Sequence, residues 1–298
     1  MMSQFREALQ TGQVILMDGA MGTELRRADL PPDACGELWN LTNPERVRAI
    51  HQAYRDAGAR CLLTNTFQSN PRALSRHGVA DKLEEINRAA VAIARSVAGP
   101  DGFVLGNIGP IDPPYQAEPI RQVVSSLCGV DGLHLETYSD TDALWAVKYG
   151  CLPSLESEDV PVLLSITYKK TTEGVITTQG GQSPEVFAKL AREYGVSALG
   201  VNCGRDVGVS DISAIIRAYR AATDLPLFAR PNAGTPTRVA ETWNYPHSPD
   251  AMASELTEVL EAGATMIGGC CGTTAEHIAA FRPVIESWNE RPAPGAHI

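Results

Sequence analysis

Apolar, β-branched runs alternate with amphipathic helical patterns along the whole chain of 298 residues. Each short apolar run leads into a polar segment and then into apolar positions at helical spacing, which predicts repeated strand–helix units. The eight predicted strands cover residues 14–17, 60–63, 103–106, 132–135, 160–166, 198–201, 225–229 and 264–267. The predicted helices cover residues 4–9, 43–58, 81–98, 120–127, 140–149, 210–222, 249–262 and 275–288, and a further helix begins at residue 183.

Eight such units favour the α/β class and a single closed (β/α)8 TIM barrel. Strands separated by helices pair in parallel through right-handed crossovers, and eight units of this length fit that barrel. A doubly wound open sheet is the alternative fold, but the first loop, Asp18-Gly-Ala-Met-Gly22, does not match the Gly-x-Gly-x-x-Gly phosphate-binding turn. No linker or composition break divides the chain, so we expect one domain over residues 1–298.

Composition narrows the class of protein further. The chain has 25 basic and 35 acidic residues and a formal net charge of −10, which argues against a nucleic-acid-binding surface. No apolar run reaches the ~20 residues that span a bilayer, and the polar N-terminus has no signal-peptide core, so we expect no membrane association and a cytoplasmic location. The seven cysteines are odd in number and dispersed, which favours reduced thiols over a disulfide framework.

Three of these cysteines follow predicted strands. Cys270 and Cys271 lie between glycines after the eighth strand, and Cys203 follows the sixth. Because the carboxyl ends of barrel strands form one rim, the three thiolates are expected to converge on a metal ion. Thiolates favour Zn²⁺, and three protein ligands leave the fourth position open, as in catalytic zinc sites. The alternatives are hydrophobic packing, or a disulfide between Cys203 and one of the pair. Packing is the expected role of Cys35, Cys61, Cys128 and Cys151.

Polar residues at other strand ends belong to the same predicted rim. Asp18 and Glu136 follow the first and fourth strands, and Asn65 and Asn232 follow the second and seventh. A carboxylate at such a position can hold a substrate ammonium group. The alternative is an ordinary helix cap or a loop ion pair, and the residue pattern alone leaves both open.

Taken together, these motifs resemble the zinc-dependent homocysteine S-methyltransferases, a family that includes the homocysteine-binding module of cobalamin-dependent methionine synthase and betaine–homocysteine methyltransferase. The matching stretches run in family order over nearly the whole chain. They are Asp18-Gly-Ala-Met-Gly-Thr23, Thr64-Asn-Thr-Phe67, Glu136-Thr137 with Asp140, Gly200-Val-Asn-Cys203, Pro231-Asn-Ala-Gly234 and Gly268-Gly-Cys-Cys-Gly-Thr-Thr274. The connection over residues 111–130 is shorter than is usual in the family, which affects the surface that would face the methyl donor.

The resemblance implies a (β/α)8 barrel and a role for each matching residue. Zn²⁺ would be held by Cys203, Cys270 and Cys271. The amino group of homocysteine would be held by Asp18 and Glu136, and its carboxylate by backbone groups near Gly19 and Ala20. Asn202, next to the first cysteine, joins the residues expected to bind substrate.

The implied reaction moves a methyl group to the homocysteine thiol and gives methionine. A free thiol with a pKa near ~8.5 is mostly protonated at neutral pH, and zinc coordination removes that proton, so we assign no general base and no catalytic residue beyond the zinc site. The donor stays open between a betaine-like molecule, S-methylmethionine and a methyl-corrinoid protein. Rival functions are methyl transfer to another thiol or selenol, and a non-catalytic zinc- or thiol-binding barrel that depends on a separate methyl-donor protein.

Overall fold

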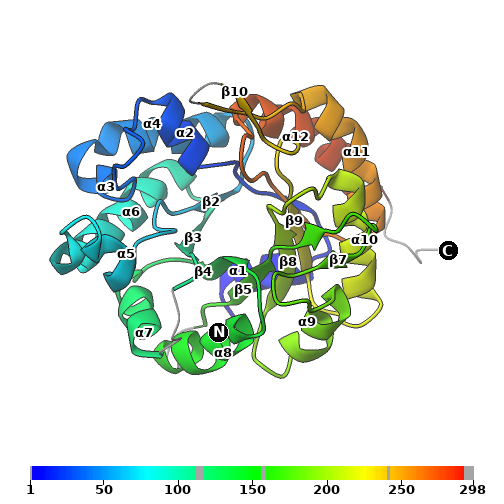
Figure 1. Cartoon of the computed structure of the whole chain (residues 1–298), viewed down its shortest axis with the longest axis horizontal. Coiled ribbons are helices and arrows are strands. Elements are labelled where there is room, and N and C mark those ends of the chain that lie inside the picture. Colours follow the sequence, from blue (N-terminus) through cyan, green and yellow to red (C-terminus); the bar gives the residue numbers. More distant parts are fainter. Residues whose placement is uncertain (1, 112–116, 156–158, 240–241, 292–298) are drawn as a thin grey trace.

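The computed structural model describes residues 2–111, 117–155, 159–239 and 242–291. Eight parallel strands form one sheet that curves into a barrel (Figure 1). They are β1 (Ile15–Leu16), β2 (Cys61–Leu63), β3 (Phe103–Ile108), β4 (Gly132–Tyr138), β5 (Val162–Ile166), β8 (Ala198–Asn202), β9 (Leu227–Arg230) and β12 (Met266–Ile267). The strands are neighbours in chain order, β1 pairs with β12, and a parallel bridge between Met17 and Cys61 joins the first strand to the second. The predicted (β/α)8 barrel is confirmed.

Helices surround this barrel as an outer layer (Figure 1). The helices that follow barrel strands are α4 (Pro44–Asp56), α6 (Leu83–Ala98), α7 (Ala117–Ser126), α8 (Asp142–Trp145), α9 (Pro184–Ala191), α10 (Val209–Arg220), α11 (Pro249–Glu261) and α12 (Ala275–Asn289). Shorter elements are α1 (Gln4–Gln10), α2 (Gly22–Arg27), α3 (Trp39–Thr42), α5 (Pro71–Ser75), η1 (Ala80–Lys82), the π-helix η2 (Ala146–Cys151) and η3 (Leu152–Ser154). The helix predicted over residues 140–149 is therefore α8 continued as a π-helix, and α2, α3 and α5 were not predicted.

The helices α4 and α11 begin with the same sequence signal, a polar residue followed by proline. Ser248 precedes α11, its hydroxyl accepts a hydrogen bond from the Ala251 amide at 3.3 Å, and Pro249 is the first helical residue. Asn43 occupies the corresponding position before α4, but its side chain makes no capping hydrogen bond. Its amide oxygen instead accepts from the Thr42 hydroxyl at 3.0 Å.

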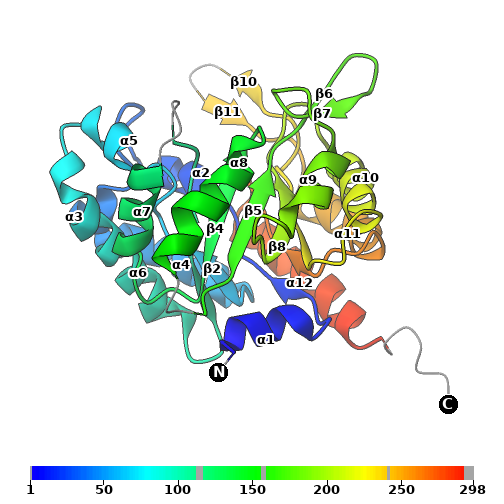
Figure 2. The same ribbon diagram turned by 90° about the horizontal axis from the view of Figure 1, so that it is seen from below.

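Two antiparallel hairpins lie at the rim, in segments where no strand was predicted from the sequence. They are β6 (Lys169–Lys170) with β7 (Ile176–Thr177), and β10 (Thr237–Val239) with β11 (Thr242–Asn244). Figure 2 shows both hairpins at the end of the barrel opposite to α1. These strands are only two or three residues long, too short for the alternation of apolar and polar positions to show a strand.

The end of the barrel opposite the rim is closed by α1 (Figure 2). Phe5 and Leu9 of this helix are buried, and the Phe5 ring contacts the Phe103 ring with centroids 4.9 Å apart. The same apolar cluster contains Leu105, Phe228 and other side chains that fill the barrel interior. The barrel interior is thus a packed core, which is typical of this fold, whose active sites lie at the rim.

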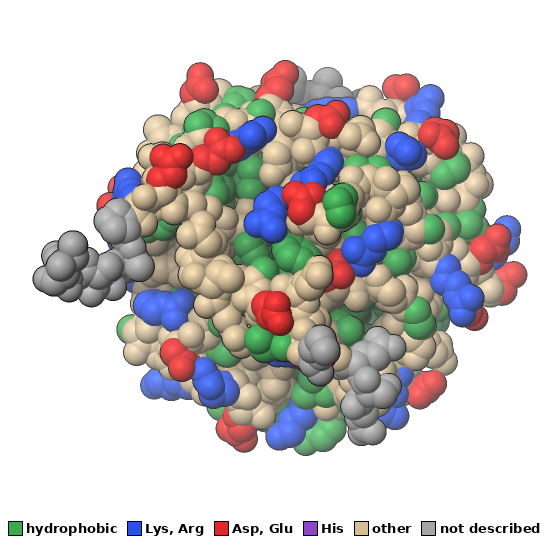
Figure 3. All heavy atoms as spheres, turned by 180° about the vertical axis from the view of Figure 1, so that it is seen from behind, with side chains coloured by type: hydrophobic (Ala, Val, Ile, Leu, Met, Phe, Trp, Pro, Cys, Tyr) green, Lys and Arg blue, Asp and Glu red, His purple; other side chains and the backbone are tan. Residues whose placement is uncertain are grey.

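The surface at the closed end mixes charges of both signs. Figure 3 shows Lys and Arg side chains interspersed with Asp and Glu side chains over the face opposite to that in Figure 1. Among the described residues, no helix is long and apolar enough to cross a membrane.

Candidate metal and substrate site

Three cysteine sulfurs meet at the rim. Cys203 directly follows β8, and Cys270 and Cys271 follow β12. Their Sγ atoms all lie within 4.8 Å of one another, a spacing that suits a single metal ion. All seven cysteines are free, so the structure does not contain the disulfide that the sequence left open. The donor set is three soft thiolates, which fits Zn²⁺.

A tight turn delivers the adjacent pair. Gly272 has φ +82°, and a Cβ there would lie 2.1 Å from the Tyr245 ring, so only glycine fits. At Gly269 the reason is space, because a Cβ would meet the Thr273 side chain at 2.3 Å. The Thr273 hydroxyl closes the turn by donating to the Cys270 carbonyl at 2.7 Å. Gly272 permits this turn through its backbone conformation and its lack of a side chain, and Gly269 permits it through its lack of a side chain alone.

Side-chain amides surround the sulfurs. Asn232 Nδ2 donates to Cys203 Sγ at 3.6 Å, and Asn202 Nδ2 donates to Cys270 Sγ at the same distance. Hydrogen bonds from the Cys270 and Cys271 thiols lower the pKa of Cys203 to about 3. The same contacts raise the pKa of Cys270.

The two predicted acids share a buried arginine. Arg230, the last residue of β9, donates from Nη1 to Asp18 Oδ1 at 2.8 Å, and its Nε lies 3.8 Å from Glu136 Oε1. The outer oxygens are bonded as well: Leu63 N donates to Asp18 Oδ2 at 2.8 Å, and Asn107 Nδ2 donates to Glu136 Oε2 at 2.7 Å. Three formal charges, two negative and one positive, therefore lie together with a sum of −1.

Arg230 and Asn107 were not among the site residues predicted from the sequence. The available signal for Arg230 was a cation at the end of the seventh predicted strand, in a rim with acids at two other strand ends. Burial raises the pKa of Asp18 and Glu136, and the Arg230 guanidinium opposes that rise for both. The arginine thus helps both acids to remain ionised in a dry site.

The residues expected near the substrate carboxylate are held firmly. Ala20 N donates to the Thr273 hydroxyl at 3.2 Å, and the Tyr54 hydroxyl donates to the Ala20 carbonyl at 2.7 Å. The Gly19 carbonyl accepts from Arg230 Nη2 at 3.3 Å. This backbone segment is therefore rigid, with its position set by the cysteine turn and by the arginine.

Asn65 has a structural role that its position at the rim did not reveal. Its Nδ2 donates to the Gly36 carbonyl at 3.0 Å and to Asn40 Oδ1 at 3.1 Å. These bonds join the segment after β2 to the segment that leads into α3.

One cavity of about 730 Å³ connects these groups. Its lining includes Asp18, Glu136, Arg230 and the three cysteines, and it extends to Glu37 and His77. The volume falls in the ~300–1,000 Å³ range of small-molecule sites. Asn202 lies outside this lining, although it is next to Cys203.

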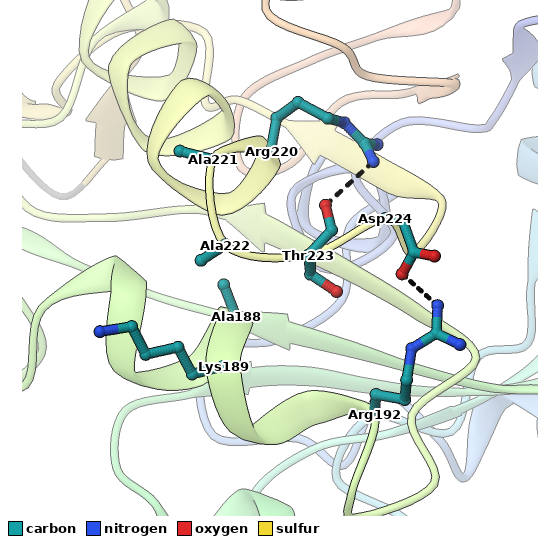
Figure 4. A pocket seen from close by; sticks show the side chains of 8 residues that line it. All are labelled: Ala188, Lys189, Arg192, Arg220, Ala221, Ala222, Thr223 and Asp224. Carbon is teal, nitrogen blue, oxygen red and sulfur yellow. Dashed lines mark hydrogen bonds and ion pairs between the residues drawn. The ribbon is translucent and has the colours of Figure 1, made fainter.

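A second cavity, of about 480 Å³, lies between α9 and the end of α10. Figure 4 shows the Arg192–Asp224 ion pair and a hydrogen bond from Arg220 to the backbone of Thr223 at this site. Its lining contains none of the rim residues named above, so we assign it no chemistry.

The geometry agrees with the comparison to known proteins. The family model described as homocysteine S-methyltransferase matches residues 15–285. The chain belongs to the homocysteine S-methyltransferase family. Similar curated proteins include methionine synthase from Mycobacterium leprae, 30% identical over 95% of this chain and 25% of that protein, and methionine synthase from Mycobacterium tuberculosis, 31% identical over 89% and 24%. The chain spans about a quarter of the length of these curated relatives.

A solved structure of this family covers nearly the whole fold. The metallated form of the homocysteine methyltransferase MmuM from Escherichia coli superposes with a TM-score of 0.76 and 25% identity, covering 94% of this chain and 99% of that one. That structure is of a metallated form. In the present chain, Cys203, Cys270 and Cys271 form a cluster that could hold a metal ion.

Proposed function

We propose that this protein transfers a methyl group to the thiol of homocysteine, giving methionine, with Zn²⁺ held by Cys203, Cys270 and Cys271. The observation that carries the proposal is the cluster of three sulfurs within 4.8 Å in the same cavity as two buried acids. Membership of the family supports the acceptor. Zn²⁺ bound by these thiolates would hold the substrate thiol deprotonated at neutral pH.

The protein's own residues would bind and orient the rest of the acceptor. Asp18 and Glu136, with Arg230 between them, carry a net charge of −1, which a single ammonium group neutralises. Gly19 and Ala20 line the same cavity, and backbone N–H groups of this segment would receive the carboxylate, with the Ala20 N–H shared between it and the Thr273 hydroxyl. Asp18, Glu136 and Arg230 are buried, which would strengthen their contacts with a bound substrate.

The cavity is compatible with two kinds of methyl donor, a small molecule and a methyl-corrinoid protein. Its volume exceeds what one amino acid fills, and the residues farthest from the strand ends include Glu37 and His77, so a small donor such as a betaine or S-methylmethionine could enter beside homocysteine. A methyl-corrinoid protein would instead approach from outside the rim. We propose a cytoplasmic enzyme and leave the donor to be chosen by experiment.

The test is a donor panel. Zinc-loaded protein is incubated with homocysteine and, separately, glycine betaine, S-methylmethionine or methylcobalamin, and methionine is measured by mass spectrometry. Cys203→Ala should lose both zinc and methionine formation, because it removes one of three metal ligands. Cys128→Ala, which changes an exposed cysteine, is the matched control and should retain both.

Two results would contradict the proposed function. Methionine formation by Cys203→Ala at the wild-type rate would refute the thiolate metal site. Homocysteine binding without methionine from any donor would favour the non-catalytic thiol-binding function over the enzyme.

A further inference from the structure

The side-chain amide of Asn202 is fully bonded within the protein. Its Oδ1 accepts from the Thr137 amide at 3.1 Å and from the Ser165 hydroxyl at 2.6 Å. Its Nδ2 donates to the Thr137 hydroxyl at 2.7 Å and to Cys270 Sγ at 3.6 Å. An amide oxygen accepts two hydrogen bonds and an amide nitrogen donates two, so no position is left for a substrate. Because a backbone N–H can only donate, the Thr137 contact also fixes which end of the amide is the oxygen.

Thr137, on the other side of this amide, has an unusual backbone. Its φ is +65°, in the left-handed region that β-branched residues rarely adopt. The pairing of β4 with β5 shifts between Leu135 and Tyr138, so Glu136 and Thr137 lie at a strand irregularity. Asn202 binds Thr137 at both its amide and its hydroxyl, and these two bonds help to stabilise the strained conformation.

That conformation matters for the substrate because Glu136 directly precedes Thr137 in the chain. In an irregular segment, the backbone rather than the regular pleat decides where the side chain points. A change in Thr137 would therefore move the Glu136 carboxylate relative to Asp18 and Arg230.

The hydrogen bond from Asn202 Nδ2 to Cys270 Sγ acts on one of the proposed metal ligands. Groups that hydrogen-bond a metal ligand orient it and tune its charge, and their loss typically weakens metal binding about 10- to 100-fold. Cys270 is buried, and Asn202 reaches its sulfur from a different strand. The hydrogen bond from Asn202 Nδ2 therefore links the end of β8 to the turn after β12.

We infer that Asn202 is a positioning residue that couples the metal site to the substrate ammonium site, through Cys270 on one side and through Thr137 and Glu136 on the other. This inference rests on the proposed function for the identity of the substrate. It gives Asn202 a role behind the site, in place of the direct substrate contact expected from the sequence motif.

The link from Asn202 to the metal site through Cys270 is the metal half of this inference, and the link to the ammonium site through Thr137 is the substrate half. The metal half is tested with Asn202→Ala and the matched variant Asn87→Ala. Asn87 is also a fully buried asparagine, on α6, and its Nδ2 donates to the Ser126 hydroxyl at 2.7 Å. Zinc affinity is measured by competition with a chromophoric chelator in the absence of thiol and donor. Asn202→Ala should bind zinc about 10- to 100-fold more weakly, and Asn87→Ala should bind it like the wild type. Equal affinities in the two variants would overturn the metal half.

The substrate half is tested by calorimetry at saturating zinc. Homocysteine is compared with 4-mercaptobutanoate, which has the same thiol and carboxylate but no ammonium group. The preference of the wild type for homocysteine should fall about tenfold in Asn202→Ala, since a misplaced Glu136 loses a hydrogen bond to a charged group. Asn87→Ala should keep the preference. An equal loss of affinity for both thiols would mean that Asn202 only shapes the pocket, and would overturn the coupling.

A second substitution separates the two halves. Glycine adopts φ near +65° without strain, so Thr137→Gly should hold the segment without help from Asn202. In the double variant Asn202→Ala/Thr137→Gly, the preference for homocysteine should return while zinc affinity stays low. Failure of the preference to return would overturn Thr137 as the link.

The outcomes also separate this inference from the proposed function. A wild-type protein that binds zinc but neither thiol would refute homocysteine as the substrate and the substrate half with it. Weaker zinc binding by Asn202→Ala alone would still support the metal half in that case.

Discussion

A single buried arginine changes the net charge that the two acids of the site present to a ligand. Asp18 and Glu136 were expected to form an acidic pair for an ammonium group, but Arg230 lies between them with a side-chain exposure of 3%. Two carboxylates facing one dry cavity would otherwise repel each other, and one would take up a proton. The arginine favours the charged form of both acids, and with both ionised the group carries one net negative charge.

Arg230→Met should destabilise the fold by about 3–5 kcal/mol at neutral pH, because it leaves two buried carboxylates without their counter-ion. Chemical denaturation measures the change in the free energy of unfolding. The loss should shrink as the pH falls, since protonated acids no longer need the arginine.

Arg282→Met is the control for this prediction. Arg282 pairs with Glu286 on the exposed side of α12, with both side chains more than half exposed, so its replacement should change stability little. Similar losses in the two variants would mean that Arg230 is not a buried counter-ion.

Among the structural elements, the turn after β12 is the most constrained. It places two adjacent cysteines toward one point, and Tyr245, which follows the β10–β11 hairpin, packs directly on Gly272. The hairpin therefore supports the metal site from above the rim. Short strands of this kind owe their existence to such packing, since an isolated hairpin is marginal in water.

Gly272→Ala should weaken zinc binding strongly, because the new Cβ would require both a strained φ and a shift of the Tyr245 ring. Zinc per protein after dialysis and the thermal midpoint are the two measurements. Gly12→Ala is the matched control, since Gly12 has φ +74° with open space around it. It should lower stability modestly and leave zinc content unchanged, and equal zinc loss in both would contradict the steric argument.

In the molecule as a whole, stability and chemistry occupy opposite ends of the barrel. The apolar interior and α1 fill one end, and the cysteines, acids and hairpins lie at the other (Figure 2). This division is general for the fold, because the strand ends that carry the loops at the rim can vary without disturbing the packed core.

Phe5→Ala should therefore separate the two properties. Removing a fully buried phenylalanine should lower the free energy of unfolding by about 3–5 kcal/mol. Zinc affinity of the folded protein should stay at the wild-type value, because the change lies at the far end of the barrel. Met2→Ala, at an exposed neighbouring position, should alter neither quantity, and a loss of zinc affinity in Phe5→Ala would contradict the separation.

The alternation of apolar runs and helical patterns was enough to predict the barrel and its eight strands. Local patterns carry this information because barrel strands such as β3 and β5 are buried on both faces and read as continuous apolar runs, while each helix buries one face. The convergence of Cys203, Cys270 and Cys271 was also predictable, since their position after strand ends assigns them to one rim. The small hairpins and the short helices near the rim were missed, because two to six residues hold too little periodicity.

Tertiary structure alone decided the charges and contacts of the site. That Arg230 neutralises one of two acids, and that the Asn202 amide joins Cys270 to Thr137, depends on distances between strands far apart in sequence. The positive φ of Thr137 likewise has no sequence signal, because threonine gives no local reason to adopt it. Residue types at strand ends define which groups reach the rim, and only the packing of the closed barrel determines which of them bind one another and which are left for a ligand.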